Sequence, residues 1–264
     1  MKNNKDFKND KSEILISKIM DKIDFCISKN KIQTTDFLSQ EEQKSIEKSI
    51  KSNGIKNYII TGGFIESERK MFLFYPDKLE NIVDKINLNE FINAIRIILP
   101  NEKIGEYSHK NYLSALIKLG ITRDKIGDII VDDKGADIII KPEICKFLLL
   151  NLPSLTRFSK SRIEKISLEE LREINIKTEI IKITVASMRL DNIVSELAHC
   201  SRAKANEILE QERVLINHET FAKASKEIKV NDIVTIRGKG RFIIKDIVGE
   251  SKKGRLFIEV EKFI

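Results

Sequence analysis

Long apolar segments are absent from this chain of 264 residues. No run approaches the roughly 18 to 20 apolar residues that a helix needs to cross a bilayer. The N-terminal stretch MKNNKDFKNDK also lacks the apolar core of a secretory signal peptide. We therefore expect no membrane association and a cytoplasmic location.

Cysteine and histidine are scarce. Cys26, Cys145 and Cys200 lie far apart and form no CxxC pair, so neither a disulfide framework nor a zinc site is indicated, and we interpret all three as buried thiols. The three histidines are dispersed as well, which leaves no Ser-His-Asp set and no histidine-rich metal site. We expect no catalytic residue, no metal and no cofactor.

Charge, in contrast, is abundant and unbalanced. Charged residues make up 33% and hydrophobic residues 41% of the chain, which is typical of a folded protein. The formal net charge of +7 and the isoelectric point near 9.1 favour a polyanionic partner, because a basic surface attracts phosphate at long range. AT-rich coding would also enrich a chain in Ile, Lys and Asn, so charge alone does not establish that partner. The length predicts two or three domains.

The N-terminal region has apolar residues at helical spacing between Lys11 and Ser52. The pattern changes near Gly54, and residues 58–61 and 71–75 then indicate two short strands. The glycines and charges of GGFIESERK between them predict a hairpin or a bulged connection. We expect a mostly helical N-terminal α+β domain over residues 1–85.

The middle region has the element order strand, helix, strand, strand, helix, strand. These elements are expected at residues 92–99, 108–120, 128–131, 136–140, 142–152 and 178–185. The order is that of a ferredoxin-like or RNA-recognition-motif-like domain, which we place at residues 86–182. Its strands hold almost no aromatic residues, so base stacking on the sheet is not favoured.

The C-terminal region, residues 183–264, begins with two short helices. An apolar stripe over residues 190–197 at i, i+3, i+4 and i+7 predicts the first, with Asp191 as its N-cap. Ser201 is a good N-cap for the second helix. Strands at residues 214–216 and 233–237 follow.

The turn RGKGR after the last of these strands favours phosphate binding. Gly238 and Gly240 allow a ligand to approach the backbone, and Arg237, Lys239 and Arg241 place three cations within five residues. An arginine fork can bind two phosphate oxygens at once. Candidates for the same surface are Arg189, Arg202 and Arg213, although each arginine taken alone is equally well explained as a solvated surface charge.

At this point a family resemblance can be stated. The segment RLDNIVSELAHCSRAKANEILEQERVLIN and the later VNDIVTIRGKGRF resemble the S-four domain, which recurs in heat-shock protein fifteen, tyrosyl-tRNA synthetases and pseudouridine synthases. This chain departs from the family at Glu212, where many members have glycine, and at His218 and Glu219, where they have glycine and lysine. The resemblance implies that RNA backbone meets a face formed by Arg189, Ser201, Arg202, Lys204 and Asn206.

The resemblance extends upstream. The segments FLSQEEQ, GGFIESERK, SHKNYLSALIKLGITRDKIGDIIVDD and LNLPSLTR are similar to the bacterial YlmH family of RNA-binding proteins. Of the family's HRD sequence, expected at residues 109–111, only His109 matches. The resemblance implies a helical N-terminal domain, a middle RNA-recognition-motif-like domain and a C-terminal S-four domain. It also implies action on large ribosomal subunits that still carry peptidyl-tRNA after a stalled ribosome has split.

Other readings of the sequence remain open. S-four domains accompany RNA-modifying enzymes, but the first 180 or so residues are short for a synthase domain and no GxGxxG loop follows a strand. Residues 66–70 form either an acid–base pair, a charged surface hairpin or a contact with the ribosome. The aspartates of residues 128–137 lack calcium-loop spacing, so a hairpin turn explains them better. A general RNA-binding or ribosome-assembly factor would also fit.

We predict a three-domain, non-enzymatic α+β protein that acts as a monomer, binds ribosomal RNA or tRNA on the large subunit, and has no membrane or DNA partner. Replacing Arg202 and Lys204 by alanine should weaken RNA binding without unfolding the domain. The predicted RNA-binding residues are Arg189, Ser201, Arg202, Lys204, Asn206, Arg213, Arg237, Lys239 and Arg241.

Overall fold

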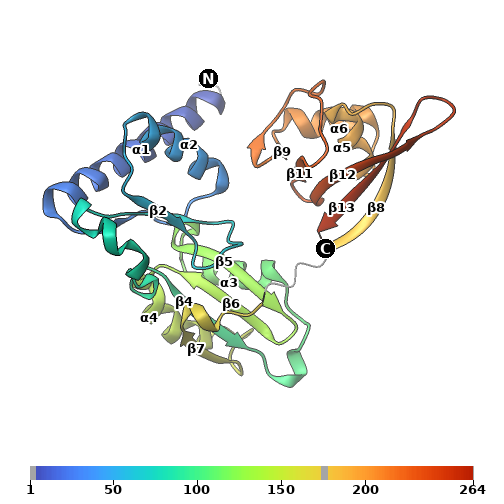
Figure 1. The fold of residues 1–264 in the computed structure, drawn as a ribbon. Helices are drawn as coiled ribbons and strands as arrows, with labels where there is room; N and C mark the ends of the chain where they lie inside the picture. Colours follow the sequence, from blue (N-terminus) through green and yellow to red (C-terminus); the bar gives the residue numbers. More distant parts are fainter. Residues whose placement is uncertain (1–3, 174–177, 264) are drawn as a thin grey trace. The chain divides into compact units, whose positions relative to one another are not determined.

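The computed structural model describes residues 4–173 and 178–263. The chain divides between residues 174 and 175 into two compact units, which we call unit 1 and unit 2. Figure 1 shows the elements of both. Among the helices of the described residues, none is long and apolar enough to cross a membrane.

Unit 1 opens with two helices and a small sheet, so the predicted mostly helical start and the two strands after it are confirmed. The apolar residues of both helices pack against the aromatic side chains of the central strand, including Phe72 and Phe74. Ser39 begins the second helix with a capping box in which Glu42 takes part. The elements are α1 (Asn4–Lys29), β1 (Gln33–Thr34), α2 (Gln40–Ser52), β2 (Tyr58–Thr61) and β3 (Met71–Phe74), with antiparallel sheet order β1-β3-β2.

The second sheet of unit 1 follows a series of short 3-10 helices. Its elements are β4 (Asn93–Ile98), α3 (His109–Lys118), β5 (Ile126–Asp132), β6 (Gly135–Ile140), α4 (Pro142–Asn151) and β7 (Arg162–Ile166). The antiparallel sheet order is β5-β6-β4-β7. Side chains of α3 and α4, such as Tyr112 and Leu148, form one core with Ile95 and Ile138 on one face of this sheet.

The fourth strand of this sheet is not the one expected from the sequence. The segment Thr178–Val185 (β8) pairs along its length with β13 (Leu256–Phe263) in unit 2, so the expected boundary after residue 182 falls inside a strand of the other sheet. The fourth strand is instead β7, at one edge of the sheet, whose sequence RIEKI has only one buried residue, Ile166. A partly exposed edge strand with few apolar residues gives a weak alternation signal, so the sequence pattern does not reveal it.

The other face of the second sheet is covered within unit 1. Phe37 and Met71, from the N-terminal part, form one buried cluster with Ala94, Ile139 and Ile166. The expected boundary near residue 85 therefore separates two sheets that share a hydrophobic core.

Arg69 contributes to the same junction with hydrogen bonds. Its guanidinium donates to the backbone oxygens of Phe37 and Ile126 at 2.9 Å each, and to that of Arg123 at 3.1 Å. The backbone N–H groups of Glu68 and Arg69 donate to the Asp128 carboxylate. The GGFIESERK segment thus joins the antiparallel strands β2 and β3, as the predicted hairpin does, and its contacts attach this hairpin to the second sheet.

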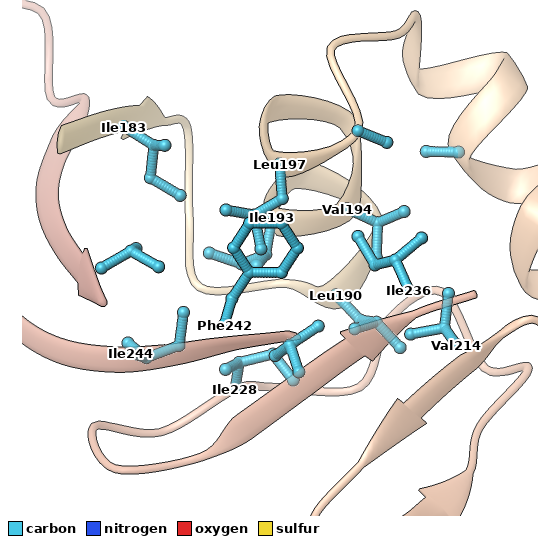
Figure 2. Close-up of a cluster of buried hydrophobic side chains, with 14 of the residues drawn as sticks. Ile183, Leu190, Ile193, Val194, Leu197, Val214, Ile228, Ile236, Phe242 and Ile244 are labelled. Atoms are coloured by element: carbon cyan, nitrogen blue, oxygen red, sulfur yellow. The ribbon is translucent and has the colours of Figure 1, made fainter. Parts of the chain in front are cut away.

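Unit 2 packs two helices on a six-stranded antiparallel sheet. Figure 2 shows the apolar cluster between them, in which Leu190, Val194 and Leu197 meet Ile236 and Phe242. The elements besides β8 and β13 are α5 (Leu190–Leu197), α6 (Arg202–Glu210), β9 (Val214–Ile216), β10 (Glu219–Thr220), β11 (Ile233–Ile236) and β12 (Gly240–Glu250), with sheet order β10-β9-β11-β12-β13-β8. Of the cysteines, Cys26 and Cys145 are buried as expected, but Cys200 is partly exposed.

Both helices of unit 2 end in the same way. His199 and Glu212 adopt left-handed φ angles of 52° and 54°. The N–H of Cys200 reaches back to the oxygen of Ser195, and that of Arg213 to the oxygen of Ile208, which are the long hydrogen bonds of a Schellman motif. Glycine usually occupies this position, so each helix end holds a side chain in a conformation that glycine adopts without strain.

Candidate nucleic-acid interface

A buried carboxylate organises the start of the two helices in unit 2. Asp191 lies in the first turn of α5, where its side chain is 2% exposed, and Arg189 occupies the N-cap position instead of the expected Asp191. Arg189 donates from Nε and Nη2 to the two carboxylate oxygens at 3.1 and 2.9 Å. Arg202 donates from Nε and Nη2 to Oδ2 at 2.9 and 2.7 Å.

The two arginines keep part of their surface in solvent. Their side chains are 43% and 54% exposed, against the 2% of Asp191. Each guanidinium has five N–H donors and uses only two on the carboxylate. The group therefore carries one net positive charge and presents oriented N–H groups outward, which we call the Asp191 clamp.

Electrostatics keep this carboxylate ionised. Burial raises the pKa of Asp191, but the hydrogen bonds and charges of Arg189 and Arg202 outweigh burial and leave the pKa below its usual value. The clamp is thus a fixed ion pair network at neutral pH.

Ser201 and Lys204 lie beside the clamp at the start of α6. The Ser201 hydroxyl accepts a hydrogen bond from the Lys204 backbone N–H at 3.2 Å, so the predicted N-cap is observed and this side chain has a structural task. Lys204 Nζ forms an exposed ion pair with Glu207 at 2.5 Å, which solvent weakens. Asn206 is partly buried, and its side-chain oxygen has no hydrogen-bond partner among the described residues.

The remaining predicted residues gather at the other end of α6. Arg213 Nη2 donates to the backbone oxygen of Arg237 at 2.8 Å, which holds the Arg213 side chain against the turn between β11 and β12. Gly238 and Gly240 have φ angles of 85° and 130°, so this turn depends on glycine. Arg237 and Lys239 are exposed, and the described parts of the chain give neither side chain a carboxylate partner. We call Arg213, Arg237 and Lys239 the turn cations.

Arg241 differs from the turn cations. Its guanidinium lies 5.6 Å from the centre of the Phe263 ring, and its side chain is only partly exposed. Apart from Asn206 and Arg241, the predicted residues thus fall into two groups, one at each end of α6. This helix of nine residues rises about 1.5 Å per residue.

Two features of the interface were not expected from the sequence. Asp191 was expected to cap a helix, but it anchors two arginines; the RLD spacing of Arg189 and Asp191 was the available signal. Arg202 is exposed beside the cap, as expected, but it also donates two hydrogen bonds to a buried carboxylate. We therefore expect replacement of Arg202 by alanine to lower the stability of unit 2 as well as RNA affinity, so the stability of the Arg202 and Lys204 double variant must be measured beside its binding.

Residues elsewhere that had been considered for chemistry have structural partners. Asp137 is fully buried between Arg96 and Arg172, and Asp128 accepts hydrogen bonds from the backbone. His109 occupies the first position of α3. Across residues 4–173 and 178–263, no group of three or more His, Cys, Asp and Glu side chains is placed to hold a metal ion.

Comparison with known proteins identifies the class of these domains. Residues 87–172 match the model described as a putative RNA-binding domain in YlmH, and residues 188–234 match the S4 domain, called the S-four domain above. The chain therefore combines two domains of RNA-binding families. Because the YlmH domain and the S4 domain occur together here, the resemblance to the YlmH family is confirmed.

Two proteins are similar over most of their length. The Bacillus subtilis (strain 168) protein named ribosome-associated protein quality control protein P2 is 26% identical over 232 residues, which cover 88% of each chain. The solved structure of cell division protein ylmH from Streptococcus pneumoniae is 21% identical, with a TM-score of 0.47, and the match covers 65% of this chain and 98% of that one.

Proposed function

We propose that this protein binds ribosomal RNA and tRNA through unit 2, on large ribosomal subunits that carry peptidyl-tRNA, as part of ribosome-associated quality control. The name of the Bacillus subtilis relative supports the pathway, and the two matched domains support RNA as the partner. The protein acts as a monomer in the cytoplasm. It works without cofactor, metal or catalytic residue, and it needs neither DNA nor a membrane.

The Asp191 clamp is the observation that carries this proposal. A single buried carboxylate orients two half-exposed arginines, so their outward N–H groups are preorganised for phosphate oxygens. Two arginines against one carboxylate leave one net positive charge, and the exposure of both side chains makes that charge accessible to a ligand. The turn cations add further positive charge at the other end of α6.

The middle region supports the rest of the proposed architecture. Its elements run β4-α3-β5-β6-α4-β7, with both helices on one face of an antiparallel sheet, which is the arrangement proposed for an RNA-recognition-motif-like domain. We propose this domain beside a helical N-terminal domain, the two sharing a core, and an S4 domain that begins with β8.

Sedimentation of tagged protein tests the pathway. Lysate from cells with a tagged copy is run through a sucrose gradient, and the RNA crosslinked to the protein is sequenced. Enrichment on free large subunits, with tRNA and one ribosomal RNA hairpin crosslinked, is the expected result. Association with large-subunit precursors without tRNA would favour an assembly factor, and scattered crosslinks away from ribosomes would leave a general RNA-binding protein.

Variants of the turn cations test the surface. Arg237→Ala combined with Lys239→Ala removes two exposed charges without breaking a described side-chain interaction. We expect RNA affinity to fall roughly tenfold, and the slope of log affinity against log salt to fall by about one for each phosphate that the variant no longer neutralises. Lys78→Ala with Lys85→Ala, which removes two exposed charges from unit 1, is the matched control. Equal affinity for both double variants would exclude the turn cations.

A further inference from the structure

The sheet of the middle domain has no open face for RNA. One face packs against α3 and α4, and the other carries Ala94, Ile139 and Ile166 under Phe37 and Met71. A domain of this topology that binds RNA on its sheet needs exposed aromatic side chains there. An RNA contact by this domain must therefore lie elsewhere.

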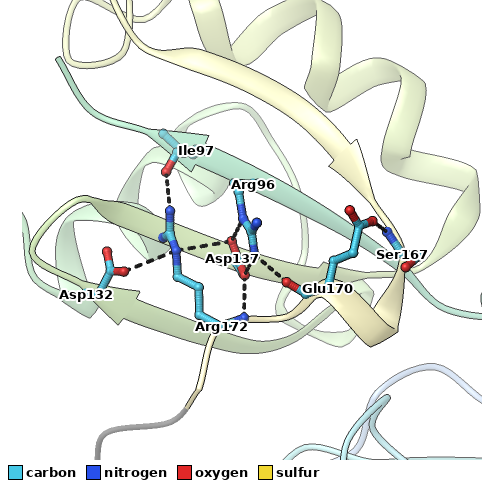
Figure 3. A network of polar contacts seen from close by, with 7 residues as sticks. All are labelled: Arg96, Ile97, Asp132, Asp137, Ser167, Glu170 and Arg172. Carbon is cyan, nitrogen blue, oxygen red and sulfur yellow. Dashed lines mark hydrogen bonds and ion pairs between the residues drawn. The ribbon is translucent and has the colours of Figure 1, made fainter.

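A polar network closes the rest of that face. Arg96 and Asp137 stand opposite each other on β4 and β6, joined by hydrogen bonds of 2.8 and 2.7 Å. Arg172, from the segment after β7, lies over the same carboxylate and donates its backbone N–H to it at 2.9 Å (Figure 3). These arginines are 22% and 13% exposed, so little of their charge is available to a ligand.

The opposite side of the domain holds a cleft with one exposed and one partly exposed cation. A cavity of about 390 Å³ lies between α3 and the segment after α4, and we call it the α3 cleft. Its charged members are Lys118 and Arg157, and its exposed hydroxyl groups belong to Ser114 and Thr156. Cations and hydroxyl groups around an open cleft are the donors that phosphate oxygens accept from.

Arg157 is held in place at the rim of this cleft. Its Nη1 donates to the backbone oxygen of Asn111 and to the Ser114 hydroxyl, the latter at 3.1 Å. Its guanidinium lies 5.6 Å from the centre of the Tyr107 ring. Lys103 lies over the same ring at 5.4 Å and donates to the Tyr107 hydroxyl at 2.8 Å.

Tyr107 is itself fixed by two other rings. It packs edge-on against Tyr112 and Phe158, with centroid distances of 6.2 and 6.0 Å. These three rings thus position Lys103 and Arg157 over the ring of Tyr107. Repulsion between the two positive charges alone would separate them.

Carboxylates do not neutralise this cluster. Within the described ranges, Lys103, Lys118 and Arg157 have no ion pair, in contrast to Arg96 and Arg172. The acidic neighbours are Glu102, which pairs with Lys160 at 3.4 Å, and the exposed Glu106.

We propose that the α3 cleft binds the phosphate backbone of RNA, as a second contact apart from unit 2. This inference rests on the proposed function in one respect, since RNA is the polyanion that the protein meets. Arg157 and Lys118 provide the charge, and the Thr156 hydroxyl provides a neutral donor. We expect the contact to be with phosphate and not with a base. Lys103 and Arg157 already lie over the ring of Tyr107, so a base does not stack on it.

The test uses the full chain and a fluorescein-labelled RNA hairpin at several KCl concentrations. Lys118→Gln with Arg157→Gln should lower affinity roughly tenfold and reduce the salt slope by about one for each phosphate no longer bound. Lys134→Gln with Lys165→Gln, exposed charges on the same domain, is the control and should change affinity by less than about twofold. Equal affinities for the two double variants would overturn the proposal.

Two further measurements keep this result interpretable. Arg157 supports Tyr107, so Lys118→Glu alone, at an exposed side chain without a described partner, reverses charge and leaves that packing intact. It should also weaken binding, and unchanged binding would overturn the proposal. The Arg237→Ala, Lys239→Ala variant runs in parallel. Loss of affinity there alone would refute only the α3 cleft, and loss in the cleft variants alone would refute only the turn cations.

Discussion

Unit 1 and unit 2 each contain one buried aspartate between two arginines, yet the two groups differ in exposure. Asp137 is fully buried, and its partners Arg96 and Arg172 are 22% and 13% exposed. Asp191 is 2% exposed, but Arg189 and Arg202 are 43% and 54% exposed. An aspartate between two arginines thus forms part of a structural network in unit 1, where Arg172 also pairs with Asp132 at 3.3 Å, and an outward-facing clamp in unit 2. Exposure of the arginines, and not their pairing, distinguishes a candidate RNA contact from an internal support.

The largest expected effect is the loss of the buried carboxylate in unit 1. Asp137→Ala leaves Arg96 without an ion pair among the described residues and Arg172 with Asp132 alone, so we expect unit 1 to lose about 3 to 5 kcal/mol of stability. All four tyrosines lie in unit 1, so their fluorescence during urea unfolding of the full chain reports on this unit alone. Asp133→Ala, at an exposed position in the same hairpin, is the control. A loss no greater than that of the control would contradict the view that Asp137 supports the sheet.

A smaller effect is expected from the equivalent change in unit 2. Asp191→Ala also removes the common acceptor of two arginines, but both can turn into water, so the expected loss is about 1 to 3 kcal/mol. Hydrogen exchange of peptides from unit 2, measured on the full chain, gives this value. A loss of stability as great as that of Asp137→Ala would contradict the distinction between the two groups. The arginines of the clamp would then depend on their carboxylate as strongly as those of unit 1 do.

Acid should weaken the clamp in a defined range of pH. The pKa of Asp191 is lowered in the folded protein, so its stabilising contribution is fully present above the unfolded value near 3.8 and is lost as pH falls through the lower folded value. The stability of unit 2, followed by hydrogen exchange with correction for the intrinsic rate, should therefore fall below about pH 4. Asp191→Asn should remove this part of the decline. An identical acid profile for both proteins would show that other carboxylates dominate.

Much of the fold could be predicted from the sequence where periodicity was strong. Helix α5 followed from its apolar stripe, and α6 from the N-cap residue Ser201 that begins it. The strand β8 was placed in the wrong sheet because alternation indicates a strand but not its partner, and its partner β13 lies about 80 residues away. The core that Phe37 shares with the second sheet of unit 1 was also not predicted. An apolar residue indicates that it is buried, but its sequence position does not indicate which surface it packs against.

The candidate site was predicted in composition but not in arrangement. Spacing identified the cations of unit 2, yet it gave Asp191 a capping role and left Arg202 unpaired. Only the fold brings the first turn of α5 against the start of α6, so a contact between residues 191 and 202 has no local sequence signal. The turn cations were predictable, because RGKGR is a local feature in which glycines fix the backbone.

The smallest effect concerns the end of α6, near the turn cations. Glu212 holds a left-handed φ of 54°, so Glu212→Gly should stabilise unit 2 by about 1 kcal/mol through relief of backbone strain. It also removes a negative charge next to Arg213, which should raise RNA affinity slightly at low salt. Glu212→Gln separates the two causes, because it removes the charge and keeps the strained backbone. Hydrogen exchange should show a gain for glycine alone, whereas hairpin binding should improve equally in both variants. A gain in stability for glutamine would mean that the carboxylate, and not the backbone conformation, limits this helix end.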